Sequence, residues 1–343
     1  MKRTATSYFK AVSFLLLFIP AFLSAQDIHF SQFYHAPLTL NPALTAADTM
    51  DYRLTANYRG QWYSALVPYL TFGAVYEQKF KIGTDGKQSF GLGLTFSYDA
   101  AGDAKLSLAQ FSAHGSYIYK LDAENFVSGG LQIGLAQRSF DPQTLTFDNQ
   151  FNGDIFDPGR PTNESFTKTN NFFADFGIGL NYHGQKIDRR SKFDAGVGLF
   201  HVNRPDQSYL PGDKAPLPMR WSLYLMPDIQ LTDIWDLTLA GTAQLQSTYF
   251  EALAGAGVRF HLNRQRSQEL AVQLGAGYRF NSFGDAVIPT IVIYYQGWTF
   301  GISYDVNISG FQAATNRNGG PEVAVRYAIN RVDPVPYKLC RLF

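Results

Sequence analysis

The histidines are the residues of this chain whose side chains are best suited to proton transfer or metal binding. They are His29, His35, His114, His183, His201 and His261. None stands at the spacing of zinc ligands, and the chain contains no HExxH, GxSxG or phosphate-loop pattern. His114 with a nearby serine is the one pairing that a hydrolase would use, since a nucleophile needs an adjoining base. Scattered polar and turn positions explain the set better, so the sequence predicts no catalytic, cofactor or metal-binding residue.

Glycine pairs with one residue between them recur along the chain and raise the question of nucleotide binding. The pairs are Gly91/Gly93, Gly177/Gly179, Gly196/Gly198, Gly255/Gly257 and Gly275/Gly277. A dinucleotide site needs a third glycine at the opening of a helix, and none of these pairs provides it. In a strand, two-residue spacing puts both glycines on one face, where glycine relieves crowding or permits curvature. We therefore assign the pairs to the lumen face of barrel strands.

Two sets of charged residues remain as candidate binding sites. Asp148, Asp154 and Asp157 share one long connection and offer oxygen ligands for calcium, but they lack the spacing of a calcium loop. A solvated acidic loop is the preferred interpretation. The basic set lies in short predicted turns and consists of Lys186, Arg189, Arg190, Arg264 and Arg266. These residues are either solvated turn residues or, as the alternative, a docking surface for an acidic partner.

The elements that must position these residues are strands with one apolar face and one small, polar face. In FGLGLTFSY, residues 90–98, large apolar side chains alternate with Gly, Thr and Ser, and alternate side chains of a strand point to opposite faces. The pattern recurs at residues 172–182, 270–280 and 300–308. A soluble sandwich buries such an apolar face, whereas a membrane barrel turns it toward lipid. The glycine-rich opposite face, the export signal described below and aromatic residues at strand ends favour the barrel.

We predict an all-β fold, a transmembrane antiparallel up-and-down β-barrel of about 14 strands. The strands are expected near residues 52–59, 69–80, 89–99, 106–120, 125–139, 171–183, 191–202, 220–231, 236–246, 248–261, 267–280, 286–296, 299–308 and 322–330. The three longest connections, residues 140–170, 203–219 and 309–321, are all odd-numbered along the chain. We therefore expect the long connections at the extracellular end and the short turns at the periplasmic end.

The start of the chain indicates export. A positively charged start precedes an apolar run at residues 11–22, and Leu23-Ser24-Ala25 offers a cleavage site, which is the anatomy of a secretory signal peptide. The run is too short to span a membrane as a helix, and no cysteine follows it for a lipoprotein anchor. We expect residues 1–25 to be the signal peptide, 26–51 an N-terminal segment and 52–343 an outer-membrane barrel with both termini periplasmic.

Composition excludes two further classes. The net charge of +1 gives no electrostatic case for nucleic acid as a partner. The single cysteine, Cys340, cannot form an internal disulfide or a cysteine metal cluster.

The N-terminal segment differs from both the signal and the strands. Its apolar and aromatic residues are Ile28, Phe30, Phe33, Tyr34, Leu38, Leu40 and Leu44. Exposing them to water costs about 25 cal/mol per Å² of apolar surface, so the segment should pack against something. Asn41-Pro42 fixes a bend, because proline locks φ. We expect the segment to lie in the lumen or at the periplasmic mouth of the barrel, or against a partner.

Several stretches carry a family resemblance. QDIHFSQFYHAPLTLNPALTA at residues 26–46, followed by NYRGQW at residues 57–62, resembles the start of the PorP/SprF membrane proteins of the type IX secretion system. Residues 135–151, FHVNRPDQSYL at residues 200–210, LPMRW at residues 217–221, residues 300–311 and the terminal KLCRLF resemble later parts of that family. The chain departs from the family at Ala46, where a glycine often follows NPA, and at Arg341, where a proline often follows the cysteine.

The resemblance implies a non-enzymatic outer-membrane component of type IX secretion, without a cofactor, that supports export or surface attachment of secreted proteins such as gliding adhesins. The implied partners are outer-membrane lipid, periplasmic and lipoprotein components of the machine, and a secreted surface protein as substrate. A passive transport barrel of the fatty-acid-transporter or porin type is the alternative. The residues that we select as candidates for coupling to a partner are Phe30, Gln32, Phe33, Asn41, Pro42, Arg59 and Trp62.

Overall fold

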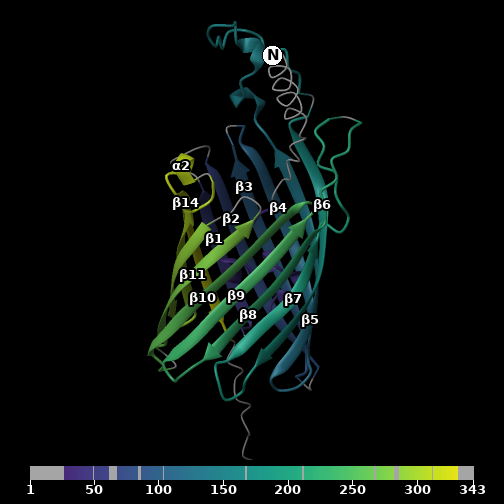
Figure 1. The fold of residues 1–343 in the computed structure, drawn as a ribbon. Helices are drawn as coiled ribbons and strands as arrows, with labels where there is room; N and C mark the ends of the chain where they lie inside the picture. Colours follow the sequence, from purple (N-terminus) through teal and green to yellow (C-terminus); the bar gives the residue numbers. More distant parts are fainter. Residues whose placement is uncertain are drawn as a thin grey trace, which may run out of the picture.

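The computed structural model describes residues 27–48, 50–61, 68–83, 86–102, 104–166, 168–210, 212–265, 268–281, 286–310 and 312–330. Within these residues, 14 antiparallel strands form one closed barrel (Figure 1). Each strand pairs with its neighbours in the chain, and β14 closes the barrel against β1 with Asn57 opposite Ala324. This arrangement confirms the predicted up-and-down barrel.

The observed strands follow the predicted ones closely. They are β1 (Tyr52–Gln61), β2 (Tyr69–Ile82), β3 (Gln88–Ala101), β4 (Leu106–Lys120), β5 (Asn125–Ser139), β6 (Asn170–Gln185), β7 (Lys192–Phe200), β8 (Arg220–Gln230), β9 (Trp235–Gln246), β10 (Tyr249–Asn263), β11 (Leu270–Asn281), β12 (Ala286–Tyr295), β13 (Trp298–Asn307) and β14 (Asn318–Ile329). The largest difference is at β14, which begins at Asn318 rather than at residue 322. Its Gly319-Gly320-Pro321 suggests a turn from sequence, but a Cβ on Gly319 would overlap Asp305, so glycine lets β14 approach β13 there.

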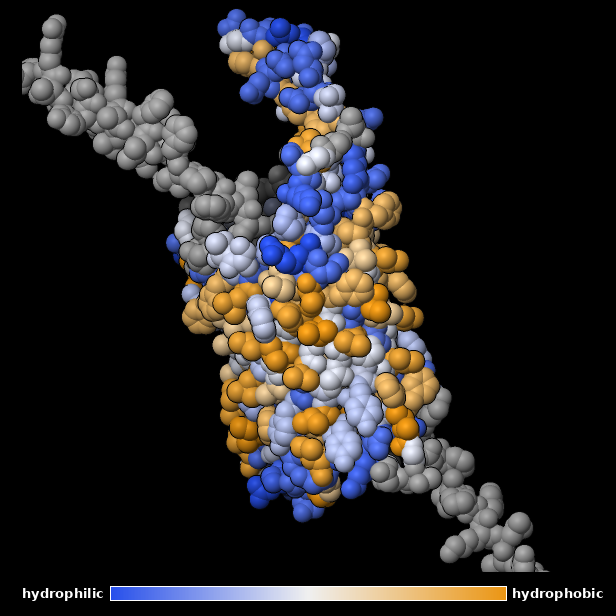
Figure 2. Space-filling model, turned by 90° about the vertical axis from the view of Figure 1, so that its right-hand side faces the viewer, coloured by the Kyte–Doolittle hydropathy of each residue, from blue (hydrophilic) through white to orange (hydrophobic). Residues whose placement is uncertain are grey.

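The apolar face of the strands points outward. On β3, Phe90, Leu92 and Leu94 are about half exposed, whereas the intervening Gly91 and Gly93 are buried. Large apolar side chains cover the barrel wall and hydrophilic ones gather at both ends (Figure 2). A soluble sandwich would show the reverse pattern, so the exposed apolar wall confirms the lipid-facing assignment. No helix among the described residues is long and apolar enough to cross a membrane.

The longest connections lie at one end of the barrel, as their odd numbering predicts. They are residues 140–169, 201–219 and 308–317, and they gather at the upper end in Figure 1. They contain the short helices η4 (Pro142–Thr144), η5 (Asp148–Gln150) and α2 (Gln312–Thr315). We call this the long-loop end and the opposite one, where β1 begins and β14 ends, the short-turn end.

Residues 27–48, which we call the plug, run through the lumen in three short 3-10 helices, η1 (Phe33–His35), η2 (Pro37–Thr39) and η3 (Pro42–Leu44). At the long-loop end, Asp27 Oδ2 lies 2.8 Å from Nε2 of His201, which directly follows β7. At the short-turn end, Asp48 Oδ2 accepts a hydrogen bond from Arg53 Nη1 at 2.8 Å. The segment is therefore not confined to one mouth of the barrel but extends along the lumen. Its first described residue, Asp27, lies at the long-loop end, whereas β14 ends at the short-turn end. The described chain thus begins and ends at opposite ends of the barrel, which differs from the expectation that both termini lie on the periplasmic side.

Candidate functional site

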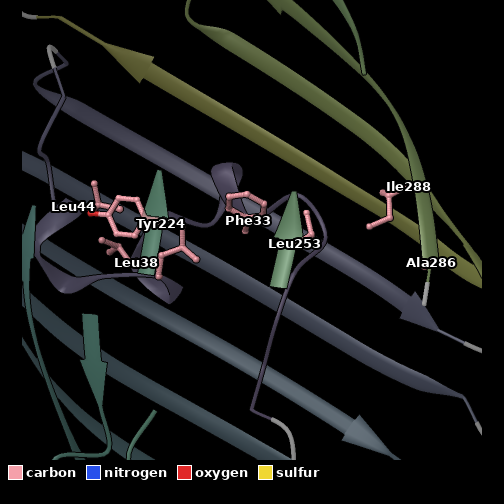
Figure 3. Packing of buried hydrophobic residues seen from close by; sticks show 8 residues of the cluster. Phe33, Leu38, Leu44, Tyr224, Leu253, Ala286 and Ile288 are labelled. Carbon is pink, nitrogen blue, oxygen red and sulfur yellow. The ribbon is translucent and has the colours of Figure 1, made fainter. Parts of the chain in front are cut away.

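The plug carries its own small hydrophobic core into a lumen that is otherwise polar. Phe33, Leu38, Leu40 and Leu44 of the plug pack with Tyr224, Leu253, Ala286 and Ile288 of β8, β10 and β12 (Figure 3). The four plug residues are each at most 5% exposed. Fully burying one leucine or phenylalanine contributes about 1.5–3 kcal/mol, so this cluster holds the middle of the plug against one side of the wall.

A second contact joins the plug to β1, β13 and β14 through charged groups. The carboxylate of Glu322 accepts the backbone N–H groups of Ser31 at 2.7 Å and Gln32 at 2.8 Å. The Gln32 side chain donates to Ser303 Oγ at 3.0 Å. Arg59, only 1% exposed, donates to His29 O at 2.9 Å and forms an ion pair with Asp305 at 2.7 Å. The structure thus brings the predicted residues Gln32 and Arg59 together around two wall carboxylates.

Asp305 balances more than one cation in this cluster. Arg279 of β11 lies 2.9 Å from the same Asp305 Oδ2 that pairs with Arg59, and it also contacts Ser31 Oγ. Ser31 Oγ in turn donates to Asp305 Oδ1 at 2.8 Å. The ion pairs of this cluster join wall residues, and the plug adds neutral groups to them, such as the Ser31 hydroxyl, which donates to Asp305. A buried charged group without its hydrogen-bond partners is costly, so the plug stabilises these wall charges.

Asn41 fixes the plug to β6 and β8. Its Oδ1 accepts the N–H of Ala43 at 2.8 Å and caps η3, and its Nδ2 donates to Leu180 O at 2.8 Å and to the Tyr224 hydroxyl at 3.0 Å. Asn41 is fully buried. Pro42 stands at the first position of η3, where its fixed φ favours the helical turn. The predicted bend at Asn41-Pro42 is therefore an anchor as well as a turn.

Lumen-facing glycines give the plug room to approach the strands. A Cβ on Gly130 of β5 would overlap the backbone of Pro42 and Ala43, and a Cβ on Gly198 of β7 would overlap Leu40 O. Ser128 Oγ, on the same face of β5 as Gly130, donates to Ala43 O at 2.7 Å. The glycine pairs thus face the lumen as predicted, and several of them also contact the plug.

Each end of the plug is held by ion pairs. At the long-loop end, His201 lies 2.8 Å from carboxylate oxygens of both Asp27 and Asp175, and Arg220 lies 3.2 Å from Asp27. Burial disfavours the charged imidazole, but the two carboxylates outweigh it and raise the pKa of His201 to about 9. The pKa of Asp27 is lowered below its usual range, because Arg220 and His201 outweigh its burial.

At the short-turn end the plug is held by Arg53 and Glu77 of the wall. Arg53 of β1 pairs with Glu77 of β2 at 2.5 and 2.6 Å, and Glu77 also accepts the backbone N–H of Ala46 at 2.9 Å. Arg53 additionally pairs with Asp48 at 2.8 Å. The last turn of the plug is thus tied to the first two strands of the barrel.

The remaining predicted coupling residues divide between the lumen and the undescribed part of the chain. Phe30 is 4% exposed, and its ring lies 3.3 Å from the position of a Cβ on Gly73 of β2. Phe33 belongs to the hydrophobic cluster. Trp62 lies outside the described residues. Six of the seven predicted residues therefore lie in the lumen, where they contact the plug or belong to it.

The wall residues that hold the plug were missed as site residues at the sequence level. They include Glu77, Asp175, His201, Tyr224, Arg279, Asp305 and Glu322. Alternation already put Asp175, Arg279 and Asp305 on the lumen face, which is the signal that marks them. A charge that faces the lumen from mid-strand needs a partner, and the plug supplies several.

The other chemical candidates have ordinary partners. His114 Nε2 lies 3.0 Å from Thr95 Oγ1, and among the described residues His114 makes no hydrogen bond to a serine. Arg190 pairs with Asp236 at 2.8 Å, Lys186 with Glu124 at 2.8 Å, and Arg264 with Asp233 at 3.7 Å, so these turn cations bind acidic groups of neighbouring strands and turns. Within the residues that the structure describes, no group of three or more His, Cys, Asp or Glu side chains is arranged to hold a metal ion.

The closed barrel, its apolar outer wall and the anchored plug define an outer-membrane β-barrel protein with an internal N-terminal segment. The sequence profile of the type IX secretion system membrane protein PorP/SprF matches residues 22–327. The chain belongs to this family of type IX secretion membrane proteins. No curated protein sequence matches it.

Solved structures share the fold at low sequence identity. The Pseudomonas putida toluene transporter TodX superposes with a TM-score of 0.50 at 12% identity, covering 86% of this chain and 93% of the other. The TodX deltaS2S3 mutant monoaromatic hydrocarbon channel gives a TM-score of 0.51 at 12% identity, covering 86% of this chain and 94% of the other. At this identity the likeness establishes the barrel fold alone.

Proposed function

We propose that this protein is a non-enzymatic outer-membrane component of type IX secretion that supports the export or surface attachment of secreted proteins such as gliding adhesins. The family match supports the secretion role. The observation that carries the scaffold role is the plug, which is bonded to the wall at both ends of the lumen and through the hydrophobic cluster between them. A barrel filled in this way is suited to holding partners rather than to passing solutes.

Orientation follows from the loops. We place the long-loop end outside the cell, where residues 140–169 and 201–219 meet the secreted protein, and the short-turn end in the periplasm, where it meets periplasmic and lipoprotein components of the machine. β14 then ends on the periplasmic side. Residues 1–25 are proposed to be the export signal.

Deleting residues 28–45 tests the role of the plug in secretion. Cells that produce this variant should assemble the barrel, as heat-modifiable electrophoretic mobility reports, but lose most secretion and surface attachment of the substrate. Unchanged secretion with a correctly assembled barrel would contradict the role of the plug. Affinity purification of the intact protein from detergent-solubilised membranes should recover a large secreted surface protein together with machine components.

A passive transport barrel is the rival function, because the solved structures of similar fold include a toluene transporter and a monoaromatic hydrocarbon channel. That rival predicts uptake of a small apolar solute by the purified barrel in liposomes. The scaffold predicts no uptake above that of protein-free liposomes.

A further inference from the structure

A cavity of about 330 Å³ lies at the short-turn end of the lumen, between the plug and strands β9 to β12. The plug residues Tyr34 and His35 form part of its lining, and Lys192, the exposed first residue of β7, marks its rim. Glycines at 255, 275 and 277 leave the space opposite the plug. We call this cavity the vestibule.

Most of the charged side chains that line the vestibule are paired with a group of opposite charge, but one arginine is not. Arg53 is paired with Glu77 and Asp48, and Asp194 is paired with His183 at 2.8 Å. Arg259 makes a longer contact with Asp228 at 3.4 Å and stacks on the ring of Tyr294. These pairings account for the acidic residues of the lining, and one arginine is left over.

That arginine is Arg326 of β14. Within the described residues it forms no ion pair, its Nη2 donates only a 3.3 Å hydrogen bond to Thr299 Oγ1, and its Nε is buried without a hydrogen-bond partner. Arg59 and Arg279, by contrast, each lie within 3 Å of a carboxylate oxygen. An arginine in a half-buried site without a carboxylate costs desolvation energy that an anionic ligand would offset.

His35 supplies an independent observation from the plug side. It is 4% exposed, it lines the same cavity, and neither ring nitrogen has a hydrogen-bond partner among the described residues. Buried polar atoms are almost always hydrogen-bonded. In either protonation state the His35 ring carries at least one N–H donor, and Arg259 and Arg326 line the same cavity.

We propose that the vestibule binds a carboxylate of a short peptide segment, a chain terminus or an acidic side chain, with Arg326 as its charged anchor and Arg259 and His35 as neighbouring donors. Arginine is suited to this, because its planar fork matches a carboxylate with two hydrogen bonds. The volume is at the lower limit of ligand pockets, so it admits the tip of a peptide rather than a folded domain. The binding of a carboxylate does not depend on the proposed function. Only the expectation that the peptide comes from the periplasm rests on it.

Titration of the purified full-length barrel in detergent tests the site. The probes are N-acetyl-Gly-Ala-Ala with a free carboxylate, the same peptide with a C-terminal amide, and inorganic phosphate. Calorimetry measures the binding of each probe. We expect the carboxylate peptide to bind at least tenfold more tightly than the amide. Equal affinity of the two peptides, or binding of phosphate alone, would overturn the assignment, and this comparison needs no variant.

Variants assign the site to Arg326. R326Q should weaken carboxylate binding about tenfold or more. R326K keeps the charge but loses the planar fork, so its affinity for the carboxylate peptide should lie between those of the wild type and R326Q. R264Q is the matched control, because Arg264 lies in a short turn at the same end but outside the vestibule, with its side chain about half exposed. Heat-modifiable mobility confirms that each variant is folded. Equal losses in R326Q and R264Q would show non-specific charge attraction and refute the site.

Discussion

The carboxylate of Glu322 on β14 accepts the backbone N–H of Gln32 at 2.8 Å, although 290 residues separate the two in the chain. Its other oxygen accepts the N–H of Ser31, and Arg59 lies 3.6 Å away. A plug that presents its own backbone to a buried carboxylate of the last strand is an integral part of the barrel. The first half of the plug and the strand that closes the barrel are therefore coupled.

The variant E322Q should loosen the first half of the plug. Glutamine keeps the shape but turns one acceptor into a donor that faces a backbone N–H, and it leaves Arg59 with one carboxylate instead of two. Leaving a buried N–H donor without its acceptor costs about 1–3 kcal/mol. Thermolysin should then cleave within residues 28–33 much faster, as mass spectrometry of the fragments reports. E269Q, at an exposed short-turn position, should match the wild type.

The variants N41A and Y224F should both loosen the plug, and N41A should loosen it more. N41A removes the cap of η3 and the bonds to Leu180 O and Tyr224, which sums to more than the 0.5–2 kcal/mol of a helix cap alone. Y224F removes only the hydroxyl contacts with Asn41 and Asn181, and a single hydrogen bond is worth about 0.5–1.5 kcal/mol. The same thermolysin assay, read at residues 40–45, should rank N41A above Y224F. The reverse order would contradict Asn41 as the main anchor.

Gly130 and Gly115 form a matched pair for the close approach of the plug. G130A places a Cβ on the backbone of Pro42 and Ala43, so the plug must shift, whereas a Cβ on Gly115 meets no atom within 4 Å. We expect G130A to lower the temperature of barrel unfolding and expose the plug to protease, and G115A to do neither. Equal effects of the two variants would mean that strand propensity rather than plug contact is responsible.

The ion pairs of His201 at the long-loop end should be lost at alkaline pH. The pKa of His201 is about 9 in the folded protein, above the usual 6.5, because the flanking Asp27 and Asp175 outweigh its burial. Arg220 also faces this group and lies 3.2 Å from Asp27. A raised pKa means that the stabilisation is complete below about pH 6.5 and is lost as the pH rises through about 9. The difference in unfolding temperature between wild type and H201Q should therefore shrink from pH 6.5 to pH 10. A constant difference would contradict the charged anchor.

The strands and the side that each face takes could be predicted from sequence, because alternation of large apolar and small residues is a local signal. Phe30, Phe33 and Leu40 likewise marked the N-terminal segment as one that must be buried. The partners of the segment were out of reach. Alternation put Asp305 and Arg279 inside, but nothing local says that Ser31 joins them from more than 240 residues away. Pairing across the lumen depends on the closed barrel, which only the three-dimensional structure supplies.

Electrical conductance of the purified barrel in planar lipid bilayers tests the central claim, that the plug closes the lumen, most directly. The wild-type protein should remain non-conducting, and the variant lacking residues 28–45 should show steady ion conductance. Heat-modifiable electrophoretic mobility confirms that both barrels are folded before they are inserted into the bilayer. Conductance of the wild type as large as that of the deletion variant would contradict the account.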